Sequence, residues 1–429
     1  MKTALLIGSG GREHAQAWKL SRSPQVKRLI IVPGNDGMSA EWERWAMPLG
    51  SRADFAAIAR RAREEKVDLA VIGPDNPLAD GIVDVFEEHG ITTFGPSAAA
   101  AQIEASKAFA KSVMAAAGVP TAHYFEARSS LEAKKILEDL DWKSGWVLKA
   151  DGLALGKGVH VCATLAEAQS ALGALEAQGH CGHLVIEERL SGEEISWMAF
   201  CDGTRCALLE PARDYKRAYD GDQGPNTGGM GALSPVPGVS PEWAARVRNE
   251  VFLPTLREMA RRGAPFRGVL YAGLMVDLQR GILNVLEFNA RFGDPETQVL
   301  LSRMDADFYE WCEASARGDL SRLPSEVPFA REAAVVVVAA ARGYPEAPQK
   351  GAPIEGPLFE NANSSEPSYF LAGVARLGQD FIVSGGRVLG AMGRSPTLEG
   401  ARTQAYARIE KIHAPGLHYR KDIASGRPS

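Results

Sequence analysis

Apolar and polar positions alternate in blocks from residue 3 to residue 94. Apolar runs of strand length are separated by stretches in which apolar residues recur at helical spacing. The runs that predict strands are residues 3–7, 28–32, 67–72 and 91–94, and the helical stretches are residues 12–20, 55–66 and 80–89. Strands without polar alternation are buried on both faces, which is typical of a parallel sheet covered by helices. Each run ends in a glycine- or proline-rich loop, where such sheets bind ligands.

The pattern becomes mixed beyond residue 105. Helices are expected at residues 106–118 and 165–178, and strands at residues 147–150, 158–162 and 184–188. Residues 270–278 and 282–289 flank a tight turn at Gln279, Arg280 and Gly281, which indicates a hairpin. A last strand is expected at residues 333–340 and a closing helix at residues 397–412. The chain is therefore predicted to be an α/β protein with further regions after the parallel sheet.

Composition narrows the class of protein. Lys and Arg number 48 against 53 Asp and Glu, a formal net charge of −5, and no basic tract favours a nucleic-acid partner. The longest apolar run, residues 333–341, is about half the length of a membrane span. Five cysteines without a CxxC pair do not form a disulfide framework. We expect a soluble, cytoplasmic protein, and we interpret the cluster at residues 180–183 as a polar turn rather than a metal site.

The first glycine-rich turn, residues 8–13, stands where a dinucleotide fingerprint would stand. Glu13 replaces its third glycine, and the second strand ends in Pro33 and Gly34 instead of an acid for a ribose hydroxyl. Both departures argue against a nicotinamide dehydrogenase. What is left is a turn before a helix N-terminus with Arg12 beside it, which suits a phosphate. The alternative is a turn needed only for sharp chain reversal.

Two further glycine-rich loops carry cations. Residues 151–159 contain Lys157 and lie between two expected strands, and Gly158 stands where a Walker A loop has Ser or Thr. Such a hairpin can fold over a triphosphate, with Lys149 and Lys107 converging on it. The third loop, residues 224–231, follows a charged stretch at residues 214–217. Three such loops predict a cleft for several anionic groups.

The stretch from residue 283 to residue 298 carries metal-type ligands. Glu287 and Asn289 are two residues apart on an expected strand, so both point to one face. A carboxylate and an amide oxygen make half of a Mg²⁺ site, and the alternative is a salt-bridged acid at a strand end. Arg291 suits a fork for a carboxylate or phosphate. Asp294 before Pro295 predicts a helix N-cap.

Together these motifs resemble the glycinamide ribonucleotide synthetase family of the ATP-grasp superfamily. The similar segments run nearly end to end: residues 10–15, 33–35, 94–96, 149–154, 224–231, 270–275, 287–298, 385–389 and 419–423. The resemblance implies an N-terminal Rossmann-like domain and a two-lobed ATP-grasp core before a small C-terminal α+β domain. The implied boundaries are residues 1–104 for the N-terminal domain, 105–190 for the small lobe with its connecting helix, 191–330 for the large lobe and 331–429 for the C-terminal domain.

The activity that the resemblance implies is ATP-dependent ligation in purine biosynthesis. Glycine would be joined to 5-phosphoribosylamine through glycyl phosphate, giving glycinamide ribonucleotide, ADP and phosphate. The implied cofactors are ATP and Mg²⁺ or Mn²⁺, and the implied state is a monomer or homodimer with small-molecule substrates only. One alternative is an ATP-grasp ligase with another amino acid or amine acceptor. A non-catalytic nucleotide-binding protein is disfavoured because Glu287, Asn289 and Lys157 are retained.

The resemblance also implies roles for individual residues. Glu287 and Asn289 match the metal ligands, and Arg291, Lys157 and Asp294 match catalytic positions. The residues matched to the nucleotide are Lys107, Lys149, Gly156, Lys157, Gly158, Glu187, Glu188 and Leu190, with Glu193 or Glu194 on the ribose. Those matched to the other substrates are Gly10, Gly11, Arg12, Asp214, Lys216, Arg217, Asn226, Gly229 and Arg291. Positions that depart from the usual family residue are Ser9, Leu155, Tyr215, Leu233, Val374 and Ala424.

Overall fold

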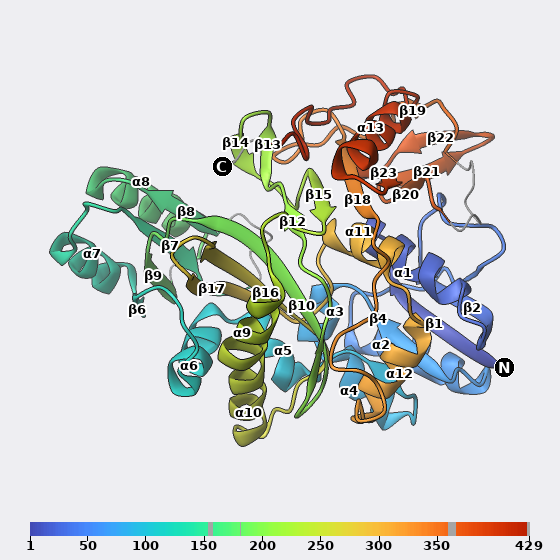
Figure 1. Cartoon of the computed structure of the whole chain (residues 1–429), viewed down its shortest axis with the longest axis horizontal. Coiled ribbons are helices and arrows are strands. Elements are labelled where there is room, and N and C mark those ends of the chain that lie inside the picture. Colours follow the sequence, from blue (N-terminus) through green and yellow to red (C-terminus); the bar gives the residue numbers. More distant parts are fainter. Residues whose placement is uncertain (153–157, 181, 359–365, 427–429) are drawn as a thin grey trace.

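The N-terminal part of the chain is a parallel sheet flanked by helices (Figure 1). The structure, a computed structural model, describes residues 1–152, 158–180, 182–358 and 366–426. The first elements are β1 (Lys2–Gly8), α1 (Gly11–Ser21), β2 (Val26–Pro33), β3 (Glu43–Arg44), α2 (Arg52–Glu64), β4 (Leu69–Ile72), α3 (Asp75–Ala79), α4 (Ile82–Glu88), β5 (Thr93–Phe94) and α5 (Ala98–Ala105). The strand order is β3-β2-β1-β4-β5, and all pairs are parallel. This pairing confirms the predicted parallel sheet. The apolar runs predicted it because its strands are buried on both faces.

A small lobe follows, at the far end of the long axis of the molecule (Figure 1). Its elements are α6 (Lys107–Ala117), β6 (Tyr124–Ala127), α7 (Ser130–Asp139), β7 (Trp146–Ala150), β8 (Val159–Cys162), α8 (Leu165–Ala177) and β9 (Leu184–Glu188). The strands form an antiparallel sheet in the order β6-β9-β7-β8. Because β7 and β8 pair directly, the loop that joins them is a hairpin loop, as its position between two strands predicted.

The large lobe is built on a four-stranded sheet in the order β11-β10-β16-β17. Its elements are β10 (Glu193–Asp202), β11 (Cys206–Leu208), α9 (Pro241–Arg246), a π-helical turn η1 (Val247–Phe252), α10 (Leu253–Arg261), β16 (Arg267–Asp277), β17 (Ile282–Asn289), α11 (Glu296–Arg303) and α12 (Phe308–Arg317). The predicted hairpin is confirmed by the antiparallel pairing of β16 with β17. An irregularity lies between Gly273 and Leu274, whereas the register from Glu287 to Asn289 is regular, so both side chains stay on one face.

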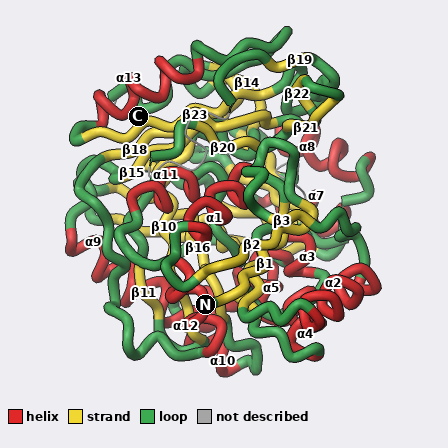
Figure 2. The backbone as a smooth tube through the Cα atoms, turned by 90° about the vertical axis from the view of Figure 1, so that its right-hand side faces the viewer, coloured by secondary structure: helices red, strands yellow, loops and turns green. Residues whose placement is uncertain are grey.

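The C-terminal sheet combines strands that are distant in sequence. The C-terminal part of the chain contains β18 (Ala333–Ala340), β19 (Pro353–Ile354), β20 (Tyr369–Leu371), β21 (Val374–Leu377), β22 (Asp380–Val383), β23 (Arg387–Ser395) and α13 (Leu398–Ile409), of which β19, β22 and β21 form a separate small sheet. Earlier strands are β12 (Arg213–Asp214), β13 (Arg217–Tyr219), β14 (Gln223–Asn226) and β15 (Gly231–Ser234). The order β12-β15-β18-β23-β20 shows that two of these join the C-terminal sheet. Helices α1 and α11 lie side by side between this sheet and β1 (Figure 2).

Side-chain caps explain where many of the helices begin. The hydroxyls that accept a hydrogen bond from the backbone of the first turn belong to Ser51, Ser97, Ser106, Ser129, Thr164 and Thr397. Each such cap stabilises its helix by about 1 kcal/mol. None of the helices in the described ranges combines the length and apolar composition needed to cross a bilayer.

The contact of α1 with β20 makes stability depend on pH. His14 Nδ1 accepts a hydrogen bond from the Leu371 backbone N–H at 2.9 Å, and the ring packs on Trp42 and Phe370. Burial lowers the pKa of His14 to about 4, below its ordinary value of 6.5. Between these values the unfolded chain binds the proton and the folded chain does not, so acid favours unfolding. We expect this histidine to remove about 3 kcal/mol of stability as the pH falls through the window.

Denaturant unfolding at several pH values measures this loss. His14→Gln is the matched variant, because a side-chain amide can accept the same hydrogen bond without titrating. The expected result is a shallower decline of the free energy of unfolding for the variant than for the parent below pH about 6.5. Equal slopes for both proteins would show that His14 is not the group responsible.

Candidate active site

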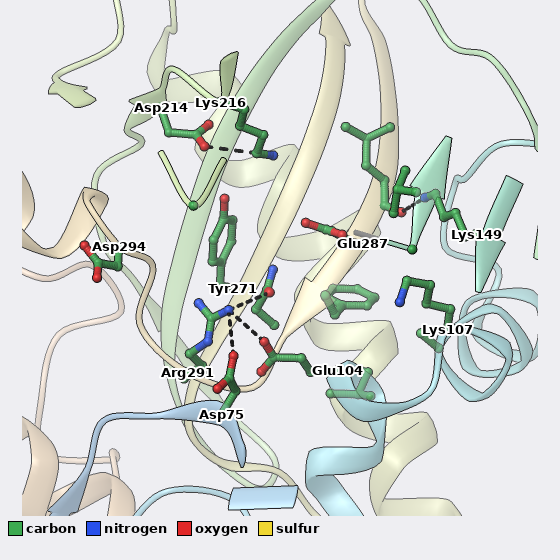
Figure 3. Close-up of a pocket in the computed structure, with 18 of the residues that line it drawn as sticks. Asp75, Glu104, Lys107, Lys149, Asp214, Lys216, Tyr271, Glu287, Arg291 and Asp294 are labelled. Atoms are coloured by element: carbon green, nitrogen blue, oxygen red, sulfur yellow. Dashed lines mark hydrogen bonds and ion pairs between the residues drawn. The ribbon is translucent and has the colours of Figure 1, made fainter. Parts of the chain in front are cut away.

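One cavity of about 480 Å³ lies where the parts of the chain meet (Figure 3). Its size is within the ordinary range of small-molecule sites. The lining comes from the N-terminal sheet through Arg12 and Asp75, from α6, β7, β9 and β17, and from the C-terminal part through Tyr344 and Arg387. Arg12 and Asp75 follow β1 and β4, so the ligand edge predicted for the parallel sheet opens into the cavity.

Two of the predicted phosphate-binding lysines line this cavity. Lys107 Nζ donates to the Gly152 carbonyl at 2.8 Å, and Lys149 Nζ donates to the Leu286 carbonyl at 3.1 Å. Burial lowers the pKa of Lys107, and nearby Glu287 opposes this shift. Gly158 also lines the cavity. Gly156 and Lys157 lie outside the described residues, and so does Leu155, which differs from the usual family residue.

Glu187 is buried between two lysines at the inner end of the small lobe. Its carboxylate lies 3.0 Å from Lys149 Nζ and 3.3 Å from Lys111 Nζ. Burial lowers the pKa of Lys111 to about 8, against the attraction of Glu187. Sequence reasoning missed Lys111, although its spacing of four from Lys107 puts both on one face of α6. Glu188 is exposed at the end of β9.

The rest of the predicted nucleotide contacts are not among the described residues that line the cavity. Leu190 is partly exposed and follows β9. Glu193 forms an ion pair with Arg213, and Glu194 forms one with Lys216. Neither glutamate is among the described residues that line the cavity, so the geometry does not choose between them for the ribose.

The predicted metal ligands face the cavity together. Glu287 and Asn289 both line it from β17, and Figure 3 shows the Glu287 carboxylate between Lys216 on one side and Lys149 and Lys107 on the other. Burial would raise the pKa of Glu287, but Lys216, Lys149 and other cations outweigh it and lower the pKa, so the group is a carboxylate. A charged oxygen donor and an amide oxygen on one face fit a divalent cation that takes its other ligands from phosphate and water.

Arg291 is held by carboxylates from the N-terminal part. Its Nη2 lies 2.9 Å from Glu104 Oε1 and 3.5 Å from Asp75 Oδ2, and donates to Asn289 Oδ1 at 3.3 Å (Figure 3). The Arg291 Nε atom is buried and has no hydrogen-bond partner within the described parts of the chain. Sequence reasoning missed Glu104 and Asp75, because no local spacing links them to Arg291.

The predicted N-cap role of Asp294 is wrong. Helix α11 begins after Pro295, and the Asp294 carboxylate instead lies 2.9 Å from Arg387 Nη2 and accepts from Gln298 Nε2 at 2.9 Å. A buried carboxylate is stabilised more by a guanidinium than by backbone N–H groups alone. Arg387 was not predicted, since it comes from β23, although it lies in one of the segments that carry the family resemblance.

The first glycine-rich turn is organised by Glu13. Its carboxylate accepts from the Gly10 N–H at 2.7 Å and from Arg12 Nε at 2.6 Å. A Cβ atom on Gly8 or Gly73 would lie 2.3 Å from the Glu13 side chain, so this acid fills the turn. The packing agrees with the exclusion of a nicotinamide cofactor. Arg12 lines the cavity, whereas Gly10 and Gly11 are not among the described residues that line it.

The third loop and the charged stretch before it, residues 214–217, reach the cavity only in part. Thr227 and Gly228 of the loop line the cavity, whereas Gly229 does not. Asp214 and Lys216 line it, and burial opposes the charge of Lys216 while Asp214 and Glu194 raise its pKa above the ordinary value. Arg217 and Asn226 pair across the β13–β14 ribbon, and the structure does not bring them to the cavity.

The loop itself is held from the C-terminal part. Gly229 packs on Pro295, where a Cβ would meet the ring at 2.4 Å. The neighbouring Gly228 donates its N–H to the Tyr344 hydroxyl at 3.0 Å and its carbonyl accepts from Arg387 at 2.6 Å.

Of the positions that depart from the family pattern, those that the structure describes do not line the cavity. The Tyr215 hydroxyl accepts from the Ala424 N–H at 3.0 Å, and Ala424 has a left-handed φ of 55°. Two departures therefore contact each other at the C-terminal anchor of the third loop. Val374 and Leu233 are buried in the apolar core, and the Ser9 carbonyl accepts from Asn35. These positions therefore give little reason to expect an ATP-grasp ligase with another amino acid or amine acceptor.

The fold and cleft define an ATP-grasp enzyme, and comparisons with known proteins agree. The N, ATP-grasp (A) and C domains of phosphoribosylglycinamide synthetase match residues 2–104, 105–297 and 334–426. The chain belongs to the phosphoribosylglycinamide synthetase family. It is 44% identical over 425 residues to the phosphoribosylamine–glycine ligase of Ralstonia nicotianae and 43% over 424 residues to that of Mesorhizobium japonicum, covering at least 97% of each protein.

Solved structures show the same relationship. The phosphoribosylamine–glycine ligase of Thermotoga maritima is similar with a TM-score of 0.82 and 34% identity, covering 98% of this chain and 100% of that one. The biotin carboxylase domain of the Hydrogenobacter thermophilus 2-oxoglutarate carboxylase has a TM-score of 0.72 at 19% identity, with 99% and 95% coverage, and shares the fold. The chain is therefore a ligase that uses ATP and a divalent metal.

Proposed function

We propose that the chain joins glycine to 5-phosphoribosylamine through glycyl phosphate, giving glycinamide ribonucleotide, ADP and phosphate. The observation that carries the proposal is the convergence of Glu287 and Asn289 with Lys107, Lys149 and Arg291 on one cavity. The metal is Mg²⁺ or Mn²⁺, and the enzyme works in the cytoplasm as a monomer or homodimer.

The residues on the lysine side of the cavity bind ATP and the divalent cation for the phosphoryl transfer. Lys107 and Lys149 hold the phosphates of ATP, and Gly156, Lys157 and Gly158 of the second glycine-rich loop add further contacts to them. Glu287 and Asn289 hold the divalent cation, which when bound offsets the charge of the transferring phosphoryl group. The base lies along β9 at Glu187, Glu188 and Leu190, and Glu193 or Glu194 takes the ribose.

The other side of the cavity orients the two substrates. Arg291 binds the glycine carboxylate, which attacks the γ-phosphorus of ATP, and Asp294 with Arg387 keeps the adjoining loop in place. The phosphate of 5-phosphoribosylamine binds at Arg12 and the turn of Gly10 and Gly11, with Asp214 and Lys216 of the charged stretch on the cavity wall. The other expected contacts, Arg217, Asn226 and Gly229, do not line the cavity and can act only through the third loop and its flanking ribbon. The amine then attacks the acyl carbon and phosphate leaves. The protein contributes position, charge and exclusion of water, and no protein nucleophile is needed.

Formation of ADP by the purified chain tests this function. MgATP is supplied with glycine alone, with freshly generated 5-phosphoribosylamine alone, and with both. The expected result is turnover only with both substrates. Turnover with another amino acid in place of glycine, or with neither substrate, would contradict the proposed acceptor and donor.

A further inference from the structure

The last turn of α5 contacts the end of β17, the strand that carries Glu287 and Asn289. Most of this turn lies before the region matched by the ATP-grasp domain. Glu104 lies on the last turn of α5, within the region matched by the N domain, and its side chain is only 9% exposed. Its Oε2 accepts from the Ala290 N–H at 2.8 Å, and its Oε1 lies 2.9 Å from Arg291 Nη2. One buried carboxylate therefore holds both the main chain and the side chain that follow Asn289.

Through Arg291, the Glu104 carboxylate affects groups that line the cavity. The guanidinium donates to Asn289 Oδ1 and to the Phe292 carbonyl, at 3.3 and 3.1 Å. The Glu104 and Asp75 carboxylates offset the cost of burying this guanidinium, which without an anionic partner would not be held at this position. Asp75 is the second acid beside it, but at 3.5 Å and without a backbone contact to β17 its hold is weaker.

The same turn is also tied to the phosphate side. Ser106 and the Lys107 N–H both donate to the Asp151 carboxylate, at 3.1 and 2.6 Å, just before the second glycine-rich loop. Residues 104–107 thus connect the end of β17, the start of α6 and the loop after β7. A side chain at this junction can fix the position of a reacting group relative to the phosphates.

We propose that Glu104 is a positioning residue for the glycine-binding guanidinium. It acts through Arg291 and does not touch a substrate. The inference rests on the proposed role of Arg291 toward the glycine carboxylate. A loss of position of about 1 Å costs on the order of 100-fold in rate or binding of the misplaced group, which sets the scale of the expected effect.

Steady-state kinetics of the full chain test the proposal with Glu104→Gln, which keeps the size and removes the charge. The KM for glycine is expected to rise about 10-fold or more, and the KM for ATP to stay within about 3-fold, since only the guanidinium is displaced. A general loss of structure would raise both constants and lower the melting temperature. Should Glu104→Gln fail to fold, Glu104→Asp serves, because the shorter chain keeps the charge but cannot reach both partners.

A double-mutant cycle with Arg291→Met separates this proposal from the proposed function. The expected result is that Glu104→Gln adds no further rise in the glycine KM once Arg291→Met is present. If Arg291→Met raises the glycine KM and Glu104→Gln does not, or if the effects are additive, the role of Glu104 is overturned while that of Arg291 stands. If Arg291→Met leaves the glycine KM unchanged, the proposed roles of both Arg291 and Glu104 are overturned. The proposed function is then still tested separately, by whether ADP formation by the unsubstituted chain requires glycine.

Discussion

Glu287→Gln is expected to reduce the rate of ADP formation by about 1000-fold, corresponding to about 4 kcal/mol in the barrier. The variant keeps the side-chain size and removes the anionic oxygen that faces Lys216, Lys149 and Lys107. An amide is a weaker ligand for Mg²⁺ than a carboxylate, and the cations around it then repel the metal. The measurement is the rate of ADP formation against Mg²⁺ concentration at saturating substrates.

Two features of that measurement make the result specific. The Mg²⁺ concentration for half-maximal rate is expected to rise, so that part of the activity returns at high Mg²⁺. The matched control is Glu64→Gln, which changes an exposed glutamate of α2 outside the cavity lining in the same way and is expected to leave the Mg²⁺ dependence unaltered. Full turnover of Glu287→Gln at low Mg²⁺ would exclude Glu287 as a metal ligand.

Lys149→Met is the second variant with a large expected effect, a fall of about 100-fold or more in kcat/KM for ATP. Methionine has a similar length and removes only the ammonium that faces the phosphates. The same ammonium lies 3.0 Å from Glu187 Oε1, so its removal leaves that buried carboxylate with Lys111 alone. We therefore also expect the free energy of unfolding to fall by about 1–3 kcal/mol.

A second substitution divides the two effects of Lys149→Met. In Lys149→Met/Glu187→Gln the unbalanced carboxylate is gone, so the stability is expected to return toward that of Glu187→Gln alone. The kcat/KM for ATP is expected to stay low, because the phosphates still lack their cation. If the double variant recovered activity together with stability, Lys149 would be a structural residue and not a phosphate ligand.

Much of the fold and part of the site could be predicted from local patterns. The strands at residues 3–7, 67–72 and 282–289 were predicted because a buried strand needs an unbroken apolar run or a turn signal beside it. Glu287 and Asn289 were predicted for the same kind of reason, since a spacing of two on a strand puts both side chains on one face. Such inferences need only the few residues that lie between the two positions.

Ion pairs between residues far apart in the sequence could not be predicted from such local patterns. The N-cap interpretation of Asp294 was reasonable for an isolated segment, but Arg387 from β23 outcompetes the helix N-terminus for the carboxylate. In the same way Glu104 holds Arg291 across 187 positions of chain, and no periodicity connects the two. Buried charges select the partner that best offsets their lost hydration, and that partner is known only after the chain has folded.

By itself the sequence determined the alternation of elements, the three glycine-rich loops and the carboxylate–amide pair of β17. The tertiary structure decided which of these meet. It brought β15 into the C-terminal sheet beside β18, and it closed the cavity with Tyr344 and Arg387 from that part of the chain. The physical reason is that backbone geometry repeats over two to four residues, whereas close packing and the pairing of buried charges act between surfaces that only the folded chain creates.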